Sequence, residues 1–326
     1  MSKMAFIYPG QGAQKAGMGK DFYAYSHLAS DIYDRASEIL DIDMKALCFQ
    51  ENDLLDQTEY TQAAMVTTCL AMTAVLEDEG LHPDVTAGLS LGEYCAIAAA
   101  GGMTTEDAIR LVRKRGILMQ NTVPRGEGAM AAVMGAETDL IEKCLASIED
   151  VSIANYNCPG QIVITGKKEA VEQAVEALKA AGVRRCVMLN VSGPFHSPMM
   201  IPAGEALNQE MADMTWSELK IPYVTNVTAE YVTDIHETRA LLAKQVASSV
   251  RWQASMERMI ADGVDTFVEI GPGKTLAGFM RKINRNVKVY TVNTAEDAHK
   301  VLAEIGVPEH KKTLTVRNKL NIQEMK

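Results

Sequence analysis

The fold is decided by residues 84–94, whose sequence is DVTAGLSLGEY. The first residues of this stretch predict a short buried strand, and the small-residue run CAIAAAGG, which follows at residues 95–102, predicts a helix. Between them, Gly88-Leu89-Ser90-Leu91-Gly92 matches the pattern GxSxG, in which two glycines permit a sharp strand-to-helix turn. Such a turn lifts the serine hydroxyl clear of the backbone at a helix N-terminus, where developing negative charge is stabilised. Ser90 is therefore a candidate nucleophile.

Strands and helices alternate on both sides of this turn. Residues 4–8 form an apolar run that ends at Pro9-Gly10, which is typical of a buried strand entering a tight loop. Residues 61–79 are apolar nearly all round and predict a long buried helix. Further along the chain, we expect strands at residues 223–226 and 266–270 and helices at residues 237–247 and 254–261. The whole pattern predicts an α/β core.

A different pattern occupies residues 126–191. Strand, helix, strand, strand, helix and strand are expected there, at residues 129–134, 138–148, 151–155, 161–165, 168–181 and 184–189. This βαββαβ order is that of a ferredoxin-like unit, which is about the right size to be inserted into a larger domain. We therefore expect a core made of residues 1–125 and 192–295, a subdomain at 126–191 and a C-terminal extension at 296–326. The end of that extension, residues 309–326, has five basic and two acidic side chains and predicts a loosely packed tail.

Composition and charge exclude several classes of function. The chain has 326 residues, 47% of them hydrophobic and 23% charged, as in ordinary globular proteins. The formal net charge, 32 − 42 = −10, argues against a nucleic-acid-binding surface. Six scattered cysteines without a CxxC pair favour neither a metal site nor a disulfide framework. The N-terminal apolar run is broken at Pro9-Gly10, too early for a signal peptide, and no run approaches the length of a membrane span. We therefore expect a soluble cytoplasmic protein that binds no membrane.

A serine nucleophile needs a neighbouring base, and His196 is the best candidate among six histidines. It lies in residues 192–198, SGPFHSP, a turn-rich loop directly after the expected subdomain. A side chain in that loop can face a cleft between the two parts of the protein. Taken alone, however, the pattern favours an ordinary loop histidine that is hydrogen-bonded to the backbone.

Seven segments, taken together, point to a family. They are PGQGAQ at residues 9–14, YTQAA at 60–64, GLSLGEY at 88–94, RKRG at 113–116, NYN with PGQ between 155 and 161, GPFHS at 193–197 and EIGPG at 269–273. Through these segments, all in the family's order, the chain resembles the malonyl-CoA:acyl carrier protein transacylases and the related acyltransferase domains of fatty-acid and polyketide synthases. The resemblance extends to about residue 295. With the GxSxG turn, it implies an α/β-hydrolase-like parallel-sheet core with an inserted ferredoxin-like βαββαβ subdomain.

The resemblance implies how the serine is activated. Ser90 matches the family's nucleophile, which becomes acylated, and His196 matches its general base. Gln245 aligns approximately with the residue whose backbone carbonyl orients that histidine. The family thus uses a serine and histidine pair with a carbonyl group in place of the acid of a catalytic triad.

The resemblance also implies how the substrate is held. The backbone N–H groups of Gln11 and Leu91 match the family's oxyanion hole. Arg115 matches the arginine that binds the free carboxylate of a malonyl group. The alternative for Arg115, which ends the basic run of residues 110–115, is that it is one more solvated charge on a helix.

The expected activity is transfer of malonyl groups from malonyl-CoA to the phosphopantetheine thiol of an acyl carrier protein, through an acyl-enzyme on Ser90. The two partners are then malonyl-CoA, a coenzyme A thioester that serves as substrate, and the carrier protein. No cofactor, metal, nucleic acid or membrane is expected to take part. Three alternatives remain open: a malonyl transferase that serves a polyketide synthase in trans, a serine thioesterase, and a scaffold without activity.

Overall fold

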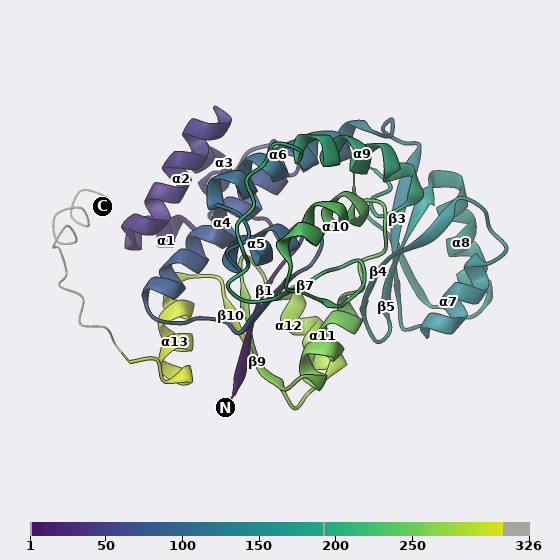
Figure 1. The fold of residues 1–326 in the computed structure, drawn as a ribbon. Coiled ribbons are helices and arrows are strands. Elements are labelled where there is room, and N and C mark those ends of the chain that lie inside the picture. Colours follow the sequence, from purple (N-terminus) through teal and green to yellow (C-terminus); the bar gives the residue numbers. More distant parts are fainter. Residues whose placement is uncertain (1, 192, 309–326) are drawn as a thin grey trace.

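The computed structural model describes residues 2–191 and 193–308, which form two sheets with helices around them (Figure 1). The expected tail at residues 309–326 lies outside the described residues. Within the described part of the chain, no helix combines the length and the apolar character that crossing a membrane requires. The parallel-sheet core and the separate antiparallel sheet confirm the predicted fold class.

The larger sheet has six strands in the order β10-β9-β1-β2-β7-β8. Every neighbouring pair is parallel except β7 and β8, which are antiparallel. The strands are β1 (Lys3–Tyr8), β2 (Val85–Gly88), β7 (Tyr223–Val224), β8 (Tyr231–Val232), β9 (Val264–Ile270) and β10 (Lys288–Val292). Because β1 and β2 are parallel neighbours, the loop after Tyr8 and the turn after Gly88 leave the sheet at the same edge.

Side chains of β1 alternate between two apolar clusters, as expected for a parallel sheet that is covered on both faces. Phe6 and Tyr8 belong to the larger cluster, together with side chains of the long helix α4. Ala5 and Ile7 point to the other face and belong to a second cluster with side chains of α11 and α12. The sequence expectation of a helix buried all round is met by α4, which has buried residues along nearly its whole length.

The helices of the core are α1 (Lys20–Tyr25), α2 (His27–Leu40), α3 (Met44–Phe49), α4 (Thr58–Asp78), α5 (Gly92–Ala99), α6 (Thr105–Asn121), α9 (Ile201–Glu210), α10 (Thr238–Gln245), α11 (Trp252–Ala261), α12 (Thr275–Ile283) and α13 (Ala295–Ile305). Two short 3-10 helices, Pro198–Met200 and Ile235–Glu237, precede α9 and α10. The last helix, α13, starts where the C-terminal extension was expected. Its Ala298, Val301 and Leu302 are buried in the larger apolar cluster, so residues 296–305 pack with the core.

The smaller sheet is antiparallel, with the strand order β4-β5-β3-β6 of a ferredoxin-like unit. Its elements are β3 (Gly128–Met134), α7 (Thr138–Leu145), β4 (Val151–Cys158), β5 (Gln161–Lys167), α8 (Lys168–Ala180) and β6 (Arg185–Met188). In Figure 1, β3 and β4 lie toward the core, and α7 and α8 lie on the far side. Val250 ties the two parts together, because its N–H donates to Ala154 and its carbonyl accepts from Tyr156, both in β4.

Candidate active site

Ser90 occupies a strained turn between β2 and α5. Its φ is +51°, a left-handed conformation that residues other than glycine seldom adopt. The two glycines of the pattern make room for this turn. A Cβ atom on Gly88 would lie 1.9 Å from the backbone of Gly92, and a Cβ on Gly92 would lie 2.2 Å from the carbonyl oxygen of Tyr8. Only glycine at both positions lets α5 begin directly over the ends of β1 and β2.

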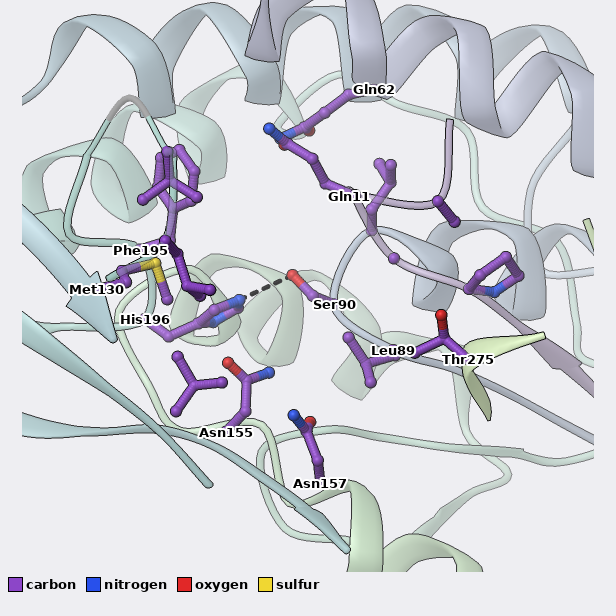
Figure 2. Close-up of a pocket in the computed structure, with 18 of the residues that line it drawn as sticks. Gln11, Gln62, Leu89, Ser90, Met130, Asn155, Asn157, Phe195, His196 and Thr275 are labelled. Carbon is purple, nitrogen blue, oxygen red and sulfur yellow. Dashed lines mark hydrogen bonds between the residues drawn. The ribbon is translucent and has the colours of Figure 1, made fainter. Parts of the chain in front are cut away.

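The hydroxyl of Ser90 lies 2.8 Å from Nε2 of His196 (Figure 2). On the other side of the ring, Nδ1 lies 2.9 Å from the carbonyl oxygen of Gln245 and 3.1 Å from that of Ser248. A carbonyl oxygen can only accept, so Nδ1 carries the proton and Nε2 is free to accept the proton of Ser90. The carbonyl of Gln245 is where the resemblance predicts it, whereas the contact with Ser248 was not expected from the sequence.

His196 is held as a neutral base. Burial, together with the positive charge of Arg115, lowers its pKa to about 4, although the two carbonyl contacts act in the opposite direction. The side chain is 5% exposed. A neutral imidazole at ordinary pH is what proton removal from a serine requires.

Arg115 is buried, with 1% of its surface exposed, and this excludes the alternative of a solvated helix charge. Its Nη1 donates to Oε1 of Gln62 at 2.9 Å. Its Nη2 donates to the hydroxyl of Ser90 and to Oε1 of Gln245, each at 3.0 Å. The guanidinium also lies over the ring of Tyr94, 5.3 Å from the ring centre. All of these partners are neutral, so the charge of Arg115 remains available to an anionic ligand.

A cavity of about 300 Å³ opens between the core and the smaller sheet and contains the Ser90 and His196 pair. Figure 2 shows side chains of both parts around it, with Asn155, Asn157 and Met130 contributed by the smaller sheet. The core contributes Gln11, Leu91 and Arg115, among others, so the structure brings all the predicted residues except Gln245 to the wall of one cavity. Gln245 lies behind His196 and Arg115.

Gln11 and Leu91 both lie on the cavity wall. Gln11 is in the loop that follows β1, and Leu91 comes directly after Ser90. Within residues 2–191 and 193–308, neither backbone N–H donates to another protein group. Two unused donors beside a nucleophile can bind a negatively charged oxygen. This geometry suits the expected oxyanion hole.

Three further polar side chains support the turn. Asn226 and Glu93 were not singled out from the sequence, and Gln245 was expected only for its backbone carbonyl. Oδ1 of Asn226 accepts the N–H of Ser90 at 2.6 Å, and its Nδ2 donates to the carbonyl of Gly88 at 2.7 Å. The side chain of Gln245 donates to the carbonyl of Ser90 at 2.9 Å and to Glu93 at 2.6 Å. A signal existed for Glu93, because a carboxylate inside a helix of small and apolar residues must be satisfied by something buried. Asn226 stands at the end of an expected strand and offered a weaker signal.

Across the described residues, no group of three or more histidine, cysteine or carboxylate side chains is arranged to hold a metal ion. The polar side chains that line the cavity are a serine, a histidine, a buried arginine, a threonine and four amides.

Comparisons with known proteins agree with one another. Residues 5–318 match the acyl transferase domain as a sequence family. The malonyl CoA-acyl carrier protein transacylase of Bacillus subtilis is 42% identical over 301 residues, which are 91% of this chain and 95% of that protein. The enzyme of the same name from a Staphylococcus aureus strain is 43% identical over 302 residues, which are 91% of this chain and 97% of that protein.

Solved structures lead to the same group of proteins. A malonyl transacylase from Streptococcus pneumoniae superimposes with a TM-score of 0.89 at 40% identity, over 93% of this chain and 100% of that one. Another malonyl-transacylase, solved in complex with a type II polyketide synthase acyl carrier protein, gives a TM-score of 0.90 at 35% identity and covers 93% of this chain and 100% of its own.

Proposed function

The chain belongs to the acyl transferase family, and we propose that it transfers the malonyl group of malonyl-CoA to the phosphopantetheine thiol of an acyl carrier protein, through an acyl-enzyme on Ser90. The transfer supplies extender units for fatty-acid synthesis. One observation carries the mechanism: Ser90 is in hydrogen-bond contact with both a neutral base, His196, and an arginine whose other partners are uncharged.

The first half-reaction forms the acyl-enzyme. His196 takes the proton of Ser90 at Nε2 while the serine oxygen attacks the thioester carbonyl. The imidazole ring of His196 is then positively charged, and the carbonyl groups of Gln245 and Ser248, which face its Nδ1–H, stabilise that charge. The N–H groups of Gln11 and Leu91 receive the developing oxyanion, and each such donor is worth roughly 3 to 4 kcal/mol in comparable sites. His196 then gives its proton to the departing thiolate of coenzyme A.

The second half-reaction reverses these steps with the carrier protein's thiol. The thiol gives its proton to His196 and its sulfur attacks the acyl-enzyme carbonyl. The bond from that carbonyl to the Ser90 oxygen then breaks, and His196 returns the proton to this oxygen. The carrier protein leaves with the malonyl group, so the whole cycle is ping-pong. Every step uses side chains and backbone groups of this chain, and the proposal includes no metal or cofactor. We place the reaction in the cytoplasm, because all six cysteines are free thiols and disulfides are favoured in oxidising compartments.

Arg115 makes malonyl the preferred acyl group in this proposal. A guanidinium grips a carboxylate through two parallel N–H donors, and the buried position of Arg115 makes that contact stronger than it would be in water. The same contact fixes the acyl group and limits the approach of water to the ester. This argues against a thioesterase, which must admit water to the acyl-enzyme.

A malonyl transferase of polyketide synthesis is the second candidate, because one of the similar structures holds a type II polyketide synthase carrier protein. Both candidates use the same chemistry at Ser90. Measuring the second half-reaction with a fatty-acid carrier protein and with a polyketide carrier protein separates them, since the physiological partner should accept malonyl groups at the lower concentration.

The proposed function is tested by mass spectrometry after brief incubation with malonyl-CoA. We expect one malonyl adduct on Ser90 and none in Ser90→Ala, which should fold normally because the hydroxyl fills no space in the apolar core. Ser217→Ala, at an exposed serine outside the cavity, serves as the matched control and should keep the adduct. An adduct on another residue would overturn the mechanism, and rapid loss of the adduct to water without any carrier protein would favour the thioesterase.

A further inference from the structure

Glu93 is a fully buried carboxylate directly behind the nucleophile, and the mechanism above gives it no role. Its Oε2 accepts two hydrogen bonds, from Nε2 of Gln245 at 2.6 Å and from the backbone N–H of Asn226 at 3.2 Å. Its Oε1 is buried and has no hydrogen bond of ordinary geometry within the described part of the chain, although the nearby hydroxyl of Thr225 lowers the pKa of the carboxyl group. A carboxylate that is incompletely satisfied in a dry interior is costly, so it needs a compensating charge nearby.

The nearest positive charge is that of Arg115, and the side-chain amide of Gln245 lies between the two. Oε1 of that amide accepts from Nη2 of Arg115 at 3.0 Å, and its Nε2 donates to Glu93 at 2.6 Å. An amide in this position aligns its dipole with both charges. Arg115 and Glu93 therefore form an ion pair that acts through one neutral amide group.

We propose that Glu93 is a positioning residue that serves as the counter-charge of Arg115 in the free enzyme, and that it takes up a proton when a malonyl carboxylate binds Arg115. This inference rests on the proposed function, since it needs Arg115 to bind the substrate's carboxylate. Before binding, Glu93 compensates the buried guanidinium and holds Gln245 in place. After binding, the substrate supplies the negative charge, and a proton from solvent neutralises Glu93.

The electrostatics favour this exchange. Burial raises the pKa of Glu93 to about 7, so its proton equilibrium already lies within the physiological range. A second carboxylate beside the same arginine raises that pKa further, because two like charges in one buried site cannot both be fully compensated. Protonation on binding therefore follows from charge balance.

The groups that face Glu93 leave it as the titrating site. Arg115 on α6 keeps its proton at any ordinary pH. Tyr94 on α5 and Tyr223 on β7 stay neutral because burial raises the pKa of both well above 10. His196, beyond Gln245, stays neutral because burial lowers its pKa to about 4. Between pH 6 and 9, a proton taken up at this site is thus expected on Glu93.

The first test measures proton uptake directly in the Ser90→Ala protein, which binds the thioester without reacting. Binding of malonyl-CoA is followed by calorimetry in buffers of different ionisation enthalpy, with acetyl-CoA as the control ligand, since the two differ only in the carboxylate. We expect uptake of about half a proton at pH 7, rising toward one at higher pH, for malonyl-CoA only. Equal proton uptake with the two ligands, including none with either, would overturn the proposal.

The second test uses Glu93→Gln, which keeps the shape and an acceptor oxygen for Gln245 while removing the charge. In wild-type protein, the KM for malonyl-CoA should rise with pH above about 7, by at most about tenfold per pH unit. In Glu93→Gln this dependence should be absent, and the ratio of malonyl to acetyl transfer at pH 8 should rise several-fold. Both follow because the carboxylate of the substrate is then the only negative charge that compensates Arg115 in this proposal.

A purely structural role for Glu93 would lower both transfers together and leave the pH slope unchanged, and that result would overturn the inference. Glu77→Gln is the matched control, because burial raises the pKa of Glu77 as it does that of Glu93, yet Glu77 is only partly buried and lies on α4 outside the cavity. It should behave as wild type. Every protein in these tests except Ser90→Ala should still be acylated at Ser90. If acylation is seen but the pH dependence is not, this inference fails and the proposed function stands; if the wild type is not acylated, the proposed function fails.

Discussion

At the scale of single residues, both members of the proposed reacting pair have left-handed backbones, with φ of +51° at Ser90 and +61° at His196. Each such residue costs of order 1 to 3 kcal/mol and persists only where its surroundings fix it. For Ser90 those surroundings are two side-chain amides: Asn226 binds its N–H and Gln245 binds its carbonyl oxygen. For His196, the backbone N–H donates to the carbonyl of Val246. The strain is thus held by hydrogen bonds from distant parts of the chain.

Arg115→Ala should separate malonyl from acetyl transfer. Losing one member of a buried charge pair costs about 2 to 5 kcal/mol, so malonyl transfer should fall roughly 30-fold to several thousand-fold. Acetyl transfer should hold steady or rise, because an acetyl group gives the buried arginine no negatively charged contact in the wild type. Arg110→Ala, at an exposed position of the same helix, is the control. An unchanged malonyl to acetyl ratio in Arg115→Ala would assign carboxylate recognition to another residue.

His196 should determine the acid limb of the pH profile. Since burial lowers its pKa to about 4, the acylation rate should show no loss from His196 protonation down to about pH 5 and fall as pH passes through 4. The same shift affects stability: unfolding frees a histidine with a pKa near 6.5, so stability present above pH 6.5 is lost as pH falls toward 4.

The matching variant is His196→Ala, which should slow acylation by at least about two orders of magnitude. It should also lose less stability than the wild type between pH 6.5 and 4, as measured by urea unfolding at several pH values. A wild-type acylation rate in this variant would place the general base elsewhere.

At the scale of elements, the turn from β2 to α5 should tolerate no added methyl group. In Gly88→Ala the new Cβ would lie 1.9 Å from the backbone of Gly92, and backbone atoms cannot move aside without moving α5. We expect destabilisation of about 1 to 3 kcal/mol or more, with loss of acylation. Gly278→Ala in α12 is the control, because nothing lies within 4 Å of the added Cβ, and it should stabilise the protein by about 0.5 to 1 kcal/mol. Equal melting temperatures for the two variants would contradict this account of the turn.

Elements with strong local patterns could be predicted from the sequence, and they were the ones that decide the fold. The strand at β1, the turn at Ser90 and the βαββαβ order of the smaller sheet all follow from short apolar runs and glycines. The helices of residues 20–49 and the strand β10 were not predicted. The helices α1 and α3 and the strand β10 are too short for a periodic pattern to be distinctive, whereas α2 has an amphipathic pattern that was missed.

The residues of the candidate site could also be predicted only in part. Ser90 and His196 could be predicted from the sequence because each lies in a distinctive local motif. Asn226 and Glu93 were missed because their contacts join residues more than 130 positions apart, as between Ser90 and Asn226 or Glu93 and Gln245. Contacts between such distant residues produce no periodic pattern in the sequence. Only the packed structure brings them together.

At the scale of the whole molecule, charge is distributed unevenly on a chain with a net charge of −10. Two basic clusters stand out in the sequence. One consists of Arg281, Lys282, Arg285 and Lys288, and the other of Lys167, Lys168, Arg184 and Arg185. In the second cluster, Lys167 and Lys168 lie beside Asp150 and Glu172. In the first cluster, all four side chains are exposed and none forms an ion pair within the described residues.

Two members of the first cluster, Arg281 and Lys282, are on the cavity side of the molecule, because Lys282 acts electrostatically on Cys158, the residue after Asn157 of the cavity wall. The cluster begins in the last turn of α12, whose Thr275, Leu276 and Phe279 line the cavity wall. Carrier proteins of this kind are typically acidic, and an unpaired basic surface near the cavity can steer and hold such a partner while its pantetheine arm reaches Ser90. Of the two clusters, we therefore favour the first as the carrier-protein contact, through Arg281 and Lys282 at the end of α12.

We predict that the double variant Arg281→Glu and Lys282→Glu raises the KM for carrier protein about tenfold or more, because charge at the rim of an interface mainly sets the association rate. Acylation of Ser90 by malonyl-CoA alone should stay near the wild-type rate. Added salt should shrink the difference between variant and wild type, since it screens exposed charges. The matched control reverses Lys167 and Lys168, whose charges already have acidic neighbours, and it should change the carrier half-reaction less. If both double variants accept carrier protein as the wild type does, the partner is recognised by neither cluster, and its contact must be sought on uncharged surface around the cavity.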